Sequence, residues 1–217
     1  MSSVYDGIIR ILTKIDTTGV KTGVADIKKE VSAIGAVDGG IGKAMLALKA
    51  ASVLVDFGKQ AVSLASDLQE VQNVVDTAFG DMAYKCEEFA SIAIEQFGMS
   101  ELAAKQASST YMAMAKSMGI AAESASDMAI EIAKLTGDVA SFYNITQDEA
   151  STKLKSIFTG ETETLKDLGV VMTQANLKVY ALSIGITKDI SAMTQAELVS
   201  LRYKYVMQQL SMAQGDF

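Results

Sequence analysis

The side chains best suited to acid–base chemistry are three carboxylates in the stretch FTGETETLKDLGVVMT, residues 158–173. Glu161 and Glu163 are two residues apart, and Asp167 follows four residues after Glu163. A general acid and a general base need carboxyl groups in differently buried environments. These three lie in a polar stretch between two expected helix ends, where solvated charge near a helix N-terminus is the simpler interpretation. We therefore interpret the stretch as a connection that ends one helix and begins the next, and we predict no catalytic pair.

Other reactive groups are scarce. The chain has no histidine, which excludes Ser-His-Asp and Cys-His arrangements and every histidine metal ligand. Cys86 is the only cysteine, and its position on an apolar stripe favours a buried structural thiol over a reactive one. Gly42-Lys43 follows a glycine cluster, but Val37 and Ala44 break the phosphate-loop pattern. We predict no catalytic, cofactor-binding or metal-binding residue, and hence no enzyme and no cofactor.

Composition narrows the class of protein. The 217 residues include no proline and are 49% apolar, which favours uninterrupted helices. The net charge of -7 and the dispersed lysines argue against specific nucleic-acid binding. No membrane segment is expected, because the longest uncharged run, Tyr205–Gly215, is shorter than the ~18 residues that a spanning helix needs. The mean hydropathy of +0.23 implies that much apolar surface goes into a core or into contacts between copies.

The chain begins with the only segment that alternates like a β-strand, GIIRILTKID at residues 7–16. Both faces of this strand are partly apolar, and no other segment alternates well enough to pair with it. We therefore predict that it pairs with another chain through a segment made of Ile8, Ile9, Arg10, Ile11, Leu12 and Thr13. A short amphipathic helix over 20–34 and a glycine-rich hinge over 35–42 follow, which predicts a boundary between residues 1–40 and 41–217.

From Lys43 onward the sequence predicts helices that stop and restart. A glycine or asparagine that can end a helix is followed by an apolar residue at Gly98, Gly119, Asn144 and Gly185. We expect Ser100 to cap the helix after Gly98, Thr146 the helix after Asn144, and Thr187 the helix after Gly185. Full capping boxes are expected at Thr146–Glu149 and Thr194–Glu197. Gly160 and Gly169 are expected to end two further helical segments. The predicted fold class is mostly α, a short N-terminal β-strand followed by an array of antiparallel amphipathic helices.

Three apolar stripes identify the expected core. The clearest consists of Ala125, Met128, Ile132, Leu135, Val139 and Phe142, with Glu123, Asp127, Glu131, Lys134 and Asp138 on the opposite face. The second consists of Met82, Cys86, Phe89, Ala93 and Phe97, widened by Ile92 and Ile94. The third, Ala103, Ala107, Tyr111, Met114 and Met118, is predicted to pack in the core, although a methionine stripe is also compatible with an adaptable binding groove.

Two stretches closely resemble the core region of phage tail tape measure proteins: SIFTGETETLKDLGVVMTQANLKVYAL at 156–182 and LRYKYVMQQLSMAQGDF at 201–217. Weaker similarity covers 67–80, 117–119 and the opening strand and helix, so the resemblance spans nearly the whole chain. The stretch at 156–182 is the most specific part. Its family-like positions are Gly160, Glu161, Leu165, Gly169, Met172, Gln174 and Asn176.

The resemblance implies a structural protein of the virion that fills the tail tube lumen, scaffolds tail assembly, sets tail length and leaves ahead of the DNA at infection. It implies self-association as a trimer or hexamer, partners among tail tube, tail tip or baseplate proteins and tail assembly chaperones, and residence in the host cytoplasm during assembly. Because family members are much longer, we expect residues 41–217 to be a tape-measure core region cut off after 217. Two alternatives stay open, a prophage-encoded or secreted membrane-active toxin domain and an enzyme with a buried carboxylate pair.

Overall fold

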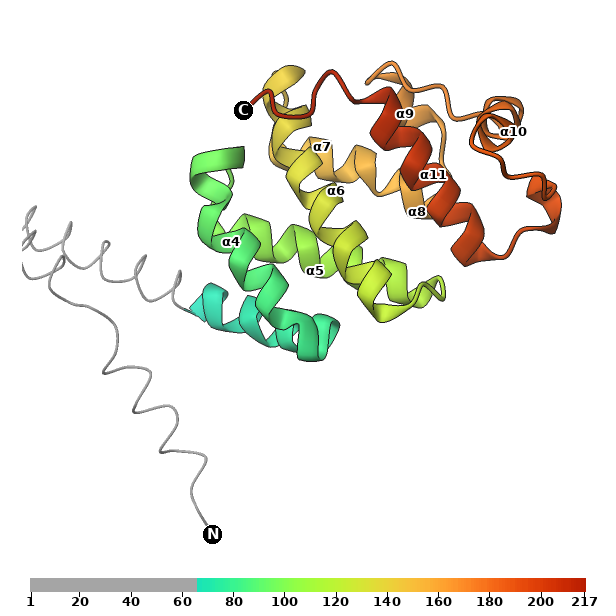
Figure 1. Ribbon diagram of the computed structural model, residues 1–217. Helices are drawn as coiled ribbons and strands as arrows, with labels where there is room; N and C mark the ends of the chain where they lie inside the picture. Colours follow the sequence, from blue (N-terminus) through green and yellow to red (C-terminus); the bar gives the residue numbers. More distant parts are fainter. Residues whose placement is uncertain (1–65) are drawn as a thin grey trace, which may run out of the picture. The chain divides into compact units, whose positions relative to one another are not determined.

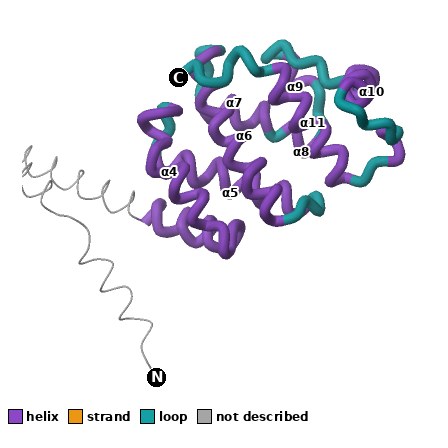
Figure 2. Tube along the Cα trace, in the orientation of Figure 1, coloured by secondary structure: helices purple, strands orange, loops and turns teal. Residues whose placement is uncertain are grey.

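The computed structural model of the chain describes residues 66–217, and every regular element in this range is helical (Figures 1 and 2). Strands are absent from the described range, so the mostly α class is confirmed for it. The predicted strand at 7–16, the hinge at 35–42 and the boundary after residue 40 lie outside the described residues. None of the helices of residues 66–217 is long and apolar enough to cross a membrane.

The described part begins with a helix over 66–79 and continues through ten further helical segments. In chain order these are η1 (Gly80–Met82), α4 (Ala83–Phe97), α5 (Glu101–Ser117), α6 (Ala122–Phe142), α7 (Gln147–Leu154), α8 (Ser156–Thr159), α9 (Glu163–Lys166), α10 (Gln174–Ser183), η2 (Ile190–Ala192) and α11 (Gln195–Gln209).

The helices end where the sequence predicts. Gly98, Gly119, Gly160, Gly169 and Gly185 all adopt positive φ, and Asn144 is the one non-glycine residue of the described range that does so, at φ 52°. After five of these turns the following apolar residue donates its N–H to a carbonyl of the helix just completed. The pairs are Met99 to Ala93, Ile120 to Ala115, Ile145 to Ala140, Val170 to Leu165 and Ile186 to Ala181. These bonds satisfy carbonyls that the helix end leaves free. Residues 100–143 are therefore two helices, α5 and α6, as predicted.

α6 is the central helix of the described part, and it contacts α4, α5 and α7 (Figure 1). Five residues of its predicted stripe are buried, but Phe142 is 42% exposed. The prediction for the opposite face is wrong at Asp138, which is buried. The reason is that α6 is surrounded by neighbours, whereas a periodic pattern identifies one apolar face only. Gly137 lies where α4 ends against α6, and a Cβ there would be 2.5 Å from the carbonyl oxygen of Phe97.

The helix caps are mostly those expected. Ser100, Thr146 and Thr194 each accept a hydrogen bond from a backbone N–H of their own helix. The capping box is complete at Thr194, where Glu197 also binds the Thr194 N–H at 2.7 Å. At Thr146 only half of the predicted box forms, because Glu149 pairs with Lys153 instead.

The cap predicted at Thr187 is wrong. The next helical segment, η2, begins two residues later than expected, and Asp189 is its N-cap. The Asp189 carboxylate accepts the backbone N–H of Ser191 at 2.9 Å. An aspartate at this position competes well with the threonine, since both side chains favour an N-cap.

On α4 the predicted stripe is buried at Cys86, Phe89 and Ala93, and Phe97 is half-buried. Ile94, which we expected to widen the stripe, is 65% exposed. Lys105 of α5 connects three helices on this side of α4. Its buried ammonium group donates to Gln72 of helix 66–79 at 2.9 Å and forms ion pairs with Glu87 of α4 and Glu101 of α5. Burial lowers the pKa of Lys105, but these two carboxylates outweigh burial and raise it.

The C-terminal residues pack back on earlier helices. α11 contacts α8 and α10, and the last residues cross to the ends of α4 and α6 (Figure 1). There the ring of Phe217 lies against Gly98, and the backbone N–H groups of Gly215 and Phe217 lie near enough to the buried Asp138 carboxylate to lower its pKa. The Oδ1 atom of Asp138 has no hydrogen-bond partner among the described residues. The apolar periodicity of the sequence could not have indicated that these C-terminal residues lie beside Asp138.

Candidate functional site

The three carboxylates Glu161, Glu163 and Asp167 lie in separate, exposed positions. Glu163 pairs with Lys166 at 2.7 Å, and its side chain is 79% exposed. Asp167 pairs with Lys153 at 2.6 Å and is also largely exposed, while Glu161 is exposed in the loop between α8 and α9. The two environments that a general acid and base require are therefore not formed by this set. Their arrangement is that of solvated charges around the short helix α9.

The family-like residues build a tightly bonded connection between α8 and α10. Leu165 and Met172 are buried in the core, and Gln174 is the first residue of α10. Asn176 donates its side-chain amide to the carbonyl of Val171 at 2.8 Å. Gly169 has φ 74° with open space around it, so its left-handed backbone is the feature that calls for glycine.

Gly160 has a second reason to be glycine. Its φ is 78°, and a Cβ on it would lie 2.6 Å from the guanidinium group of Arg202. That guanidinium donates to the carbonyl of Phe158 at 3.3 Å. A residue of α11 therefore covers the end of α8 directly.

Cys86 has the environment of a structural thiol. Its side chain is fully buried, and burial raises the pKa of the thiol to about 11. The neutral thiol is then the form present at physiological pH, and it is a weak nucleophile. The prediction that Cys86 is buried is confirmed.

Tyr111 is a fully buried residue whose hydroxyl has several hydrogen-bond partners. Its hydroxyl lies 3.0 Å from Thr136 Oγ1 and donates to Ser151 Oγ at 3.1 Å, and its ring stacks on Phe158 at 6.0 Å. Burial raises the pKa of Tyr111, and the bonds to Ser151 and Thr136 oppose that shift. The phenol therefore stays neutral and joins α5, α6 and α7 by hydrogen bonds.

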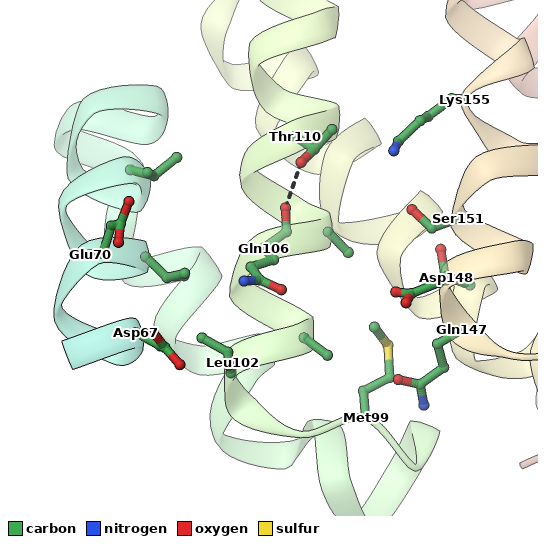
Figure 3. A pocket seen from close by; sticks show the side chains of 15 residues that line it. Asp67, Glu70, Met99, Leu102, Gln106, Thr110, Gln147, Asp148, Ser151 and Lys155 are labelled. Carbon is green, nitrogen blue, oxygen red and sulfur yellow. Dashed lines mark hydrogen bonds between the residues drawn. The ribbon is translucent and has the colours of Figure 1, made fainter. Parts of the chain in front are cut away.

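A groove of about 540 Å³ lies above this network, with α5 as its floor, helix 66–79 on one side and α7 on the other (Figure 3). Its apolar surface comes from Val71, Val74, Met99, Leu102, Ala103 and Ala107. Its polar lining consists of Asp67, Glu70, Gln106, Thr110, Thr136, Gln147, Asp148, Ser151 and Lys155. Figure 3 shows Asp67 and Glu70 on one side of α5 and Asp148, Ser151 and Lys155 on the other.

The groove is suited to binding and lacks a catalytic arrangement among its described residues. Ser151 and Lys155 are one helical turn apart, but the hydrogen bond of Ser151 Oγ within the described part is to Tyr111. Across residues 66–217 no three His, Cys, Asp or Glu side chains are grouped to hold a metal ion. What the groove offers is an apolar floor with carboxylates at its edges.

Sequence reasoning did not find this groove. Its lining comes from four helices, 66–79, α5, α6 and α7, and from the turn before α5, which only the packing brings together. Asp67 and Asp148 look like ordinary solvated charges in the sequence. The one available signal was the third apolar stripe. Its residues Ala103 and Ala107 do line the groove, whereas Met114 and Met118 pack against the core, as the preferred interpretation predicted.

Comparison with known proteins gives no relative for this chain: no protein-family model, no curated protein and no solved structure matches it.

Proposed function

We propose that the chain is part of a phage tail tape measure protein, a structural component of the virion without enzymatic activity. The proposal is carried by the resemblance of residues 156–182 and 201–217 to that family. These two stretches are separate in sequence but pack on each other in the fold, since α11 contacts both α8 and α10.

Specific contacts join the two stretches. Arg202 covers Gly160, and the Tyr205 hydroxyl donates to the carbonyl of Val171 at 3.0 Å. The rings of Tyr180 and Tyr205 meet edge to face at 5.3 Å. Residues that resemble one family in two places therefore belong to one packed substructure, which supports a common origin for both resemblances.

In this proposal the protein acts as a scaffold. Copies associate as trimers or hexamers in the tail lumen, their helices form an antiparallel array, and residues 8–13 pair with another chain. Tail tube, tail tip or baseplate proteins and tail assembly chaperones are the proposed partners, in the host cytoplasm during assembly and in the tail lumen afterwards. The acidic surface suits this location, because a chain with net charge -7 repels the DNA that shares its route.

The test is the effect on tails in the organism that encodes the chain. Removing the gene should abolish tails or give tails of abnormal length, and mass spectrometry of purified particles should detect peptides from residues 66–217. In-frame deletions in any coding sequence that continues beyond residue 217 should shorten the tail in proportion. Normal tails in the deletion strain would contradict the proposal.

A membrane-active toxin is the competing function, and it predicts a different result. Purified protein would then release dye from lipid vesicles at micromolar concentration. We expect no release, because the apolar side chains of the described part are mainly in its core.

A further inference from the structure

The groove over α5 continues into a second hollow, and together they form a trough along one helix. The second hollow has a volume of about 550 Å³ and is lined by Asn73, Thr77, Ala78, Ala113 and Lys116. It shares Glu70 and Val74 of helix 66–79 with the first, so the two hollows adjoin at these residues. We call the combined surface the α5 trough. From Leu102 to Lys116 it follows α5 for ~20 Å at 1.5 Å per residue.

The shape of the trough matches a helix. Its length corresponds to about four helical turns, and its floor is the exposed side of α5, with half-buried Leu102 and Ala103. Val74 lines both hollows and is 48% exposed. An amphipathic helix recognises a groove of this kind by inserting apolar side chains at every third or fourth position.

The charge of the trough determines the kind of helix. Asp67, Glu70 and Asp148 are exposed at the edges of the first hollow, and none forms an ion pair with a described residue. Lys155 is the single cation that lines the first hollow, and Lys116 lines the second, so the whole trough has three carboxylates and two ammonium groups and a net charge of -1. The first hollow therefore has a net charge of -2, from three carboxylates and one ammonium group, and attracts a basic ligand.

We propose that the α5 trough binds an amphipathic helix of a partner protein, one whose apolar stripe is flanked by lysine or arginine. The apolar stripe covers Val74, Leu102 and Ala103, and the basic residues pair with Asp67, Glu70 and Asp148. This inference does not rest on the proposed function, and it stands whether or not the chain belongs to a phage tail.

The probe for this site is an 18-residue helical peptide with leucine at the apolar positions and lysine at the others. Its affinity for the full chain is measured by fluorescence anisotropy at physiological salt. A peptide with glutamate in place of lysine serves as the reference. We expect the lysine peptide to bind at least tenfold more tightly than the glutamate peptide, and equal affinities would overturn the proposal.

Two pairs of variants locate the binding. The triple variant D67N/E70Q/D148N should weaken binding at least tenfold, whereas D81N/E88Q/E161Q, with the same change of charge at exposed positions outside the trough, should change it less than twofold. Val74→Ser should weaken binding several-fold, and Val179→Ser, at an exposed valine of α10, should not. Circular dichroism confirms that each variant is folded.

Two results would overturn the assignment. Equal weakening by both triple variants would show general electrostatic attraction with no defined site. Conversion of an oligomer to a monomer by Val74→Ser, measured by light scattering, would show that a second copy of the chain covers the trough in place of a different protein.

Discussion

The buried residues of α6 carry much of the stability of the described part. Ile132 is fully buried and Leu135 is 1% exposed, whereas Ser124 on the same helix is exposed. Ile132→Ala and Leu135→Ala should each lower the free energy of unfolding by about 2–5 kcal/mol, because each truncation leaves a cavity. Ser124→Ala should change it by less than ~0.5 kcal/mol. Urea denaturation measures all three, and equal midpoints would show that the core lies elsewhere.

Asp138 should make stability depend on pH in an unusual direction. Burial raises its pKa, the amides of Gly215 and Phe217 oppose the shift, and the charge of Asp216 adds to it. A raised pKa means that the folded state binds the proton more tightly than the unfolded state. The contribution of Asp138 to the stability of the folded state is therefore fully present below the pKa of an unfolded aspartate, ~3.9. It is lost as pH rises through the pKa of Asp138 in the folded state.

The neutral variant Asp138→Asn tests this dependence. At pH 7 it should be more stable than the natural chain, by an amount on the order of 1 kcal/mol, since asparagine has no charge to bury. The advantage should vanish below pH 4, where Asp138 is protonated. Melting temperatures of both proteins from pH 3 to 8 give the comparison. Lower stability of the variant at pH 7 would mean that the attraction between the backbone N–H groups of Gly215 and Phe217 and the ionised carboxylate outweighs the cost of burying its charge.

At the scale of single elements, the caps show which sequence signals are reliable. Thr194 has the complete capping box with Glu197, whose pKa is lowered to about 2 by Lys188 and by the N–H and hydroxyl groups of Thr194. Thr187 was also predicted to cap a helix, without a capping box, but it caps none. Thr194→Ala should therefore cost ~1 kcal/mol of unfolding free energy, and Thr187→Ala much less. Thermal unfolding of the two variants measures both effects. A larger loss of stability from Thr187→Ala than from Thr194→Ala would mean that the caps are wrongly assigned.

The positions of the turns were predictable because glycine and asparagine report a local requirement, the left-handed backbone, that needs no knowledge of the rest of the fold. The surroundings of each helix were not predictable in the same way. Phe142 and Asp138 exchange their expected roles because neighbours cover α6 on several sides, and one apolar stripe does not encode that. The α5 trough could not be predicted from the sequence at all, because Asp67, Leu102 and Asp148 come together only through packing.

At the scale of the whole molecule, the proposal that residues 7–16 pair with another chain makes a direct prediction. A strand needs partners for its backbone N–H and C=O groups, and no other segment of the sequence alternates well enough to supply them. Deleting residues 1–16 should leave a helical protein with a smaller molar mass in solution. Multi-angle light scattering compares the full and shortened chains. Identical masses would show that this segment has no role in association.

The neighbour-to-neighbour packing of α4, α5, α6 and α7 has a consequence for how the protein forms during synthesis. Elements that contact the next element along the chain have low contact order, and such folds assemble within microseconds to milliseconds. A ribosome adds only about 5–20 residues per second, so these four helices have time to fold as they emerge. α11 arrives later and docks on α8, and residues 215–217, which follow α11, then reach Gly98 and Asp138. These contacts are therefore added to helices that were assembled before residues 215–217 were translated.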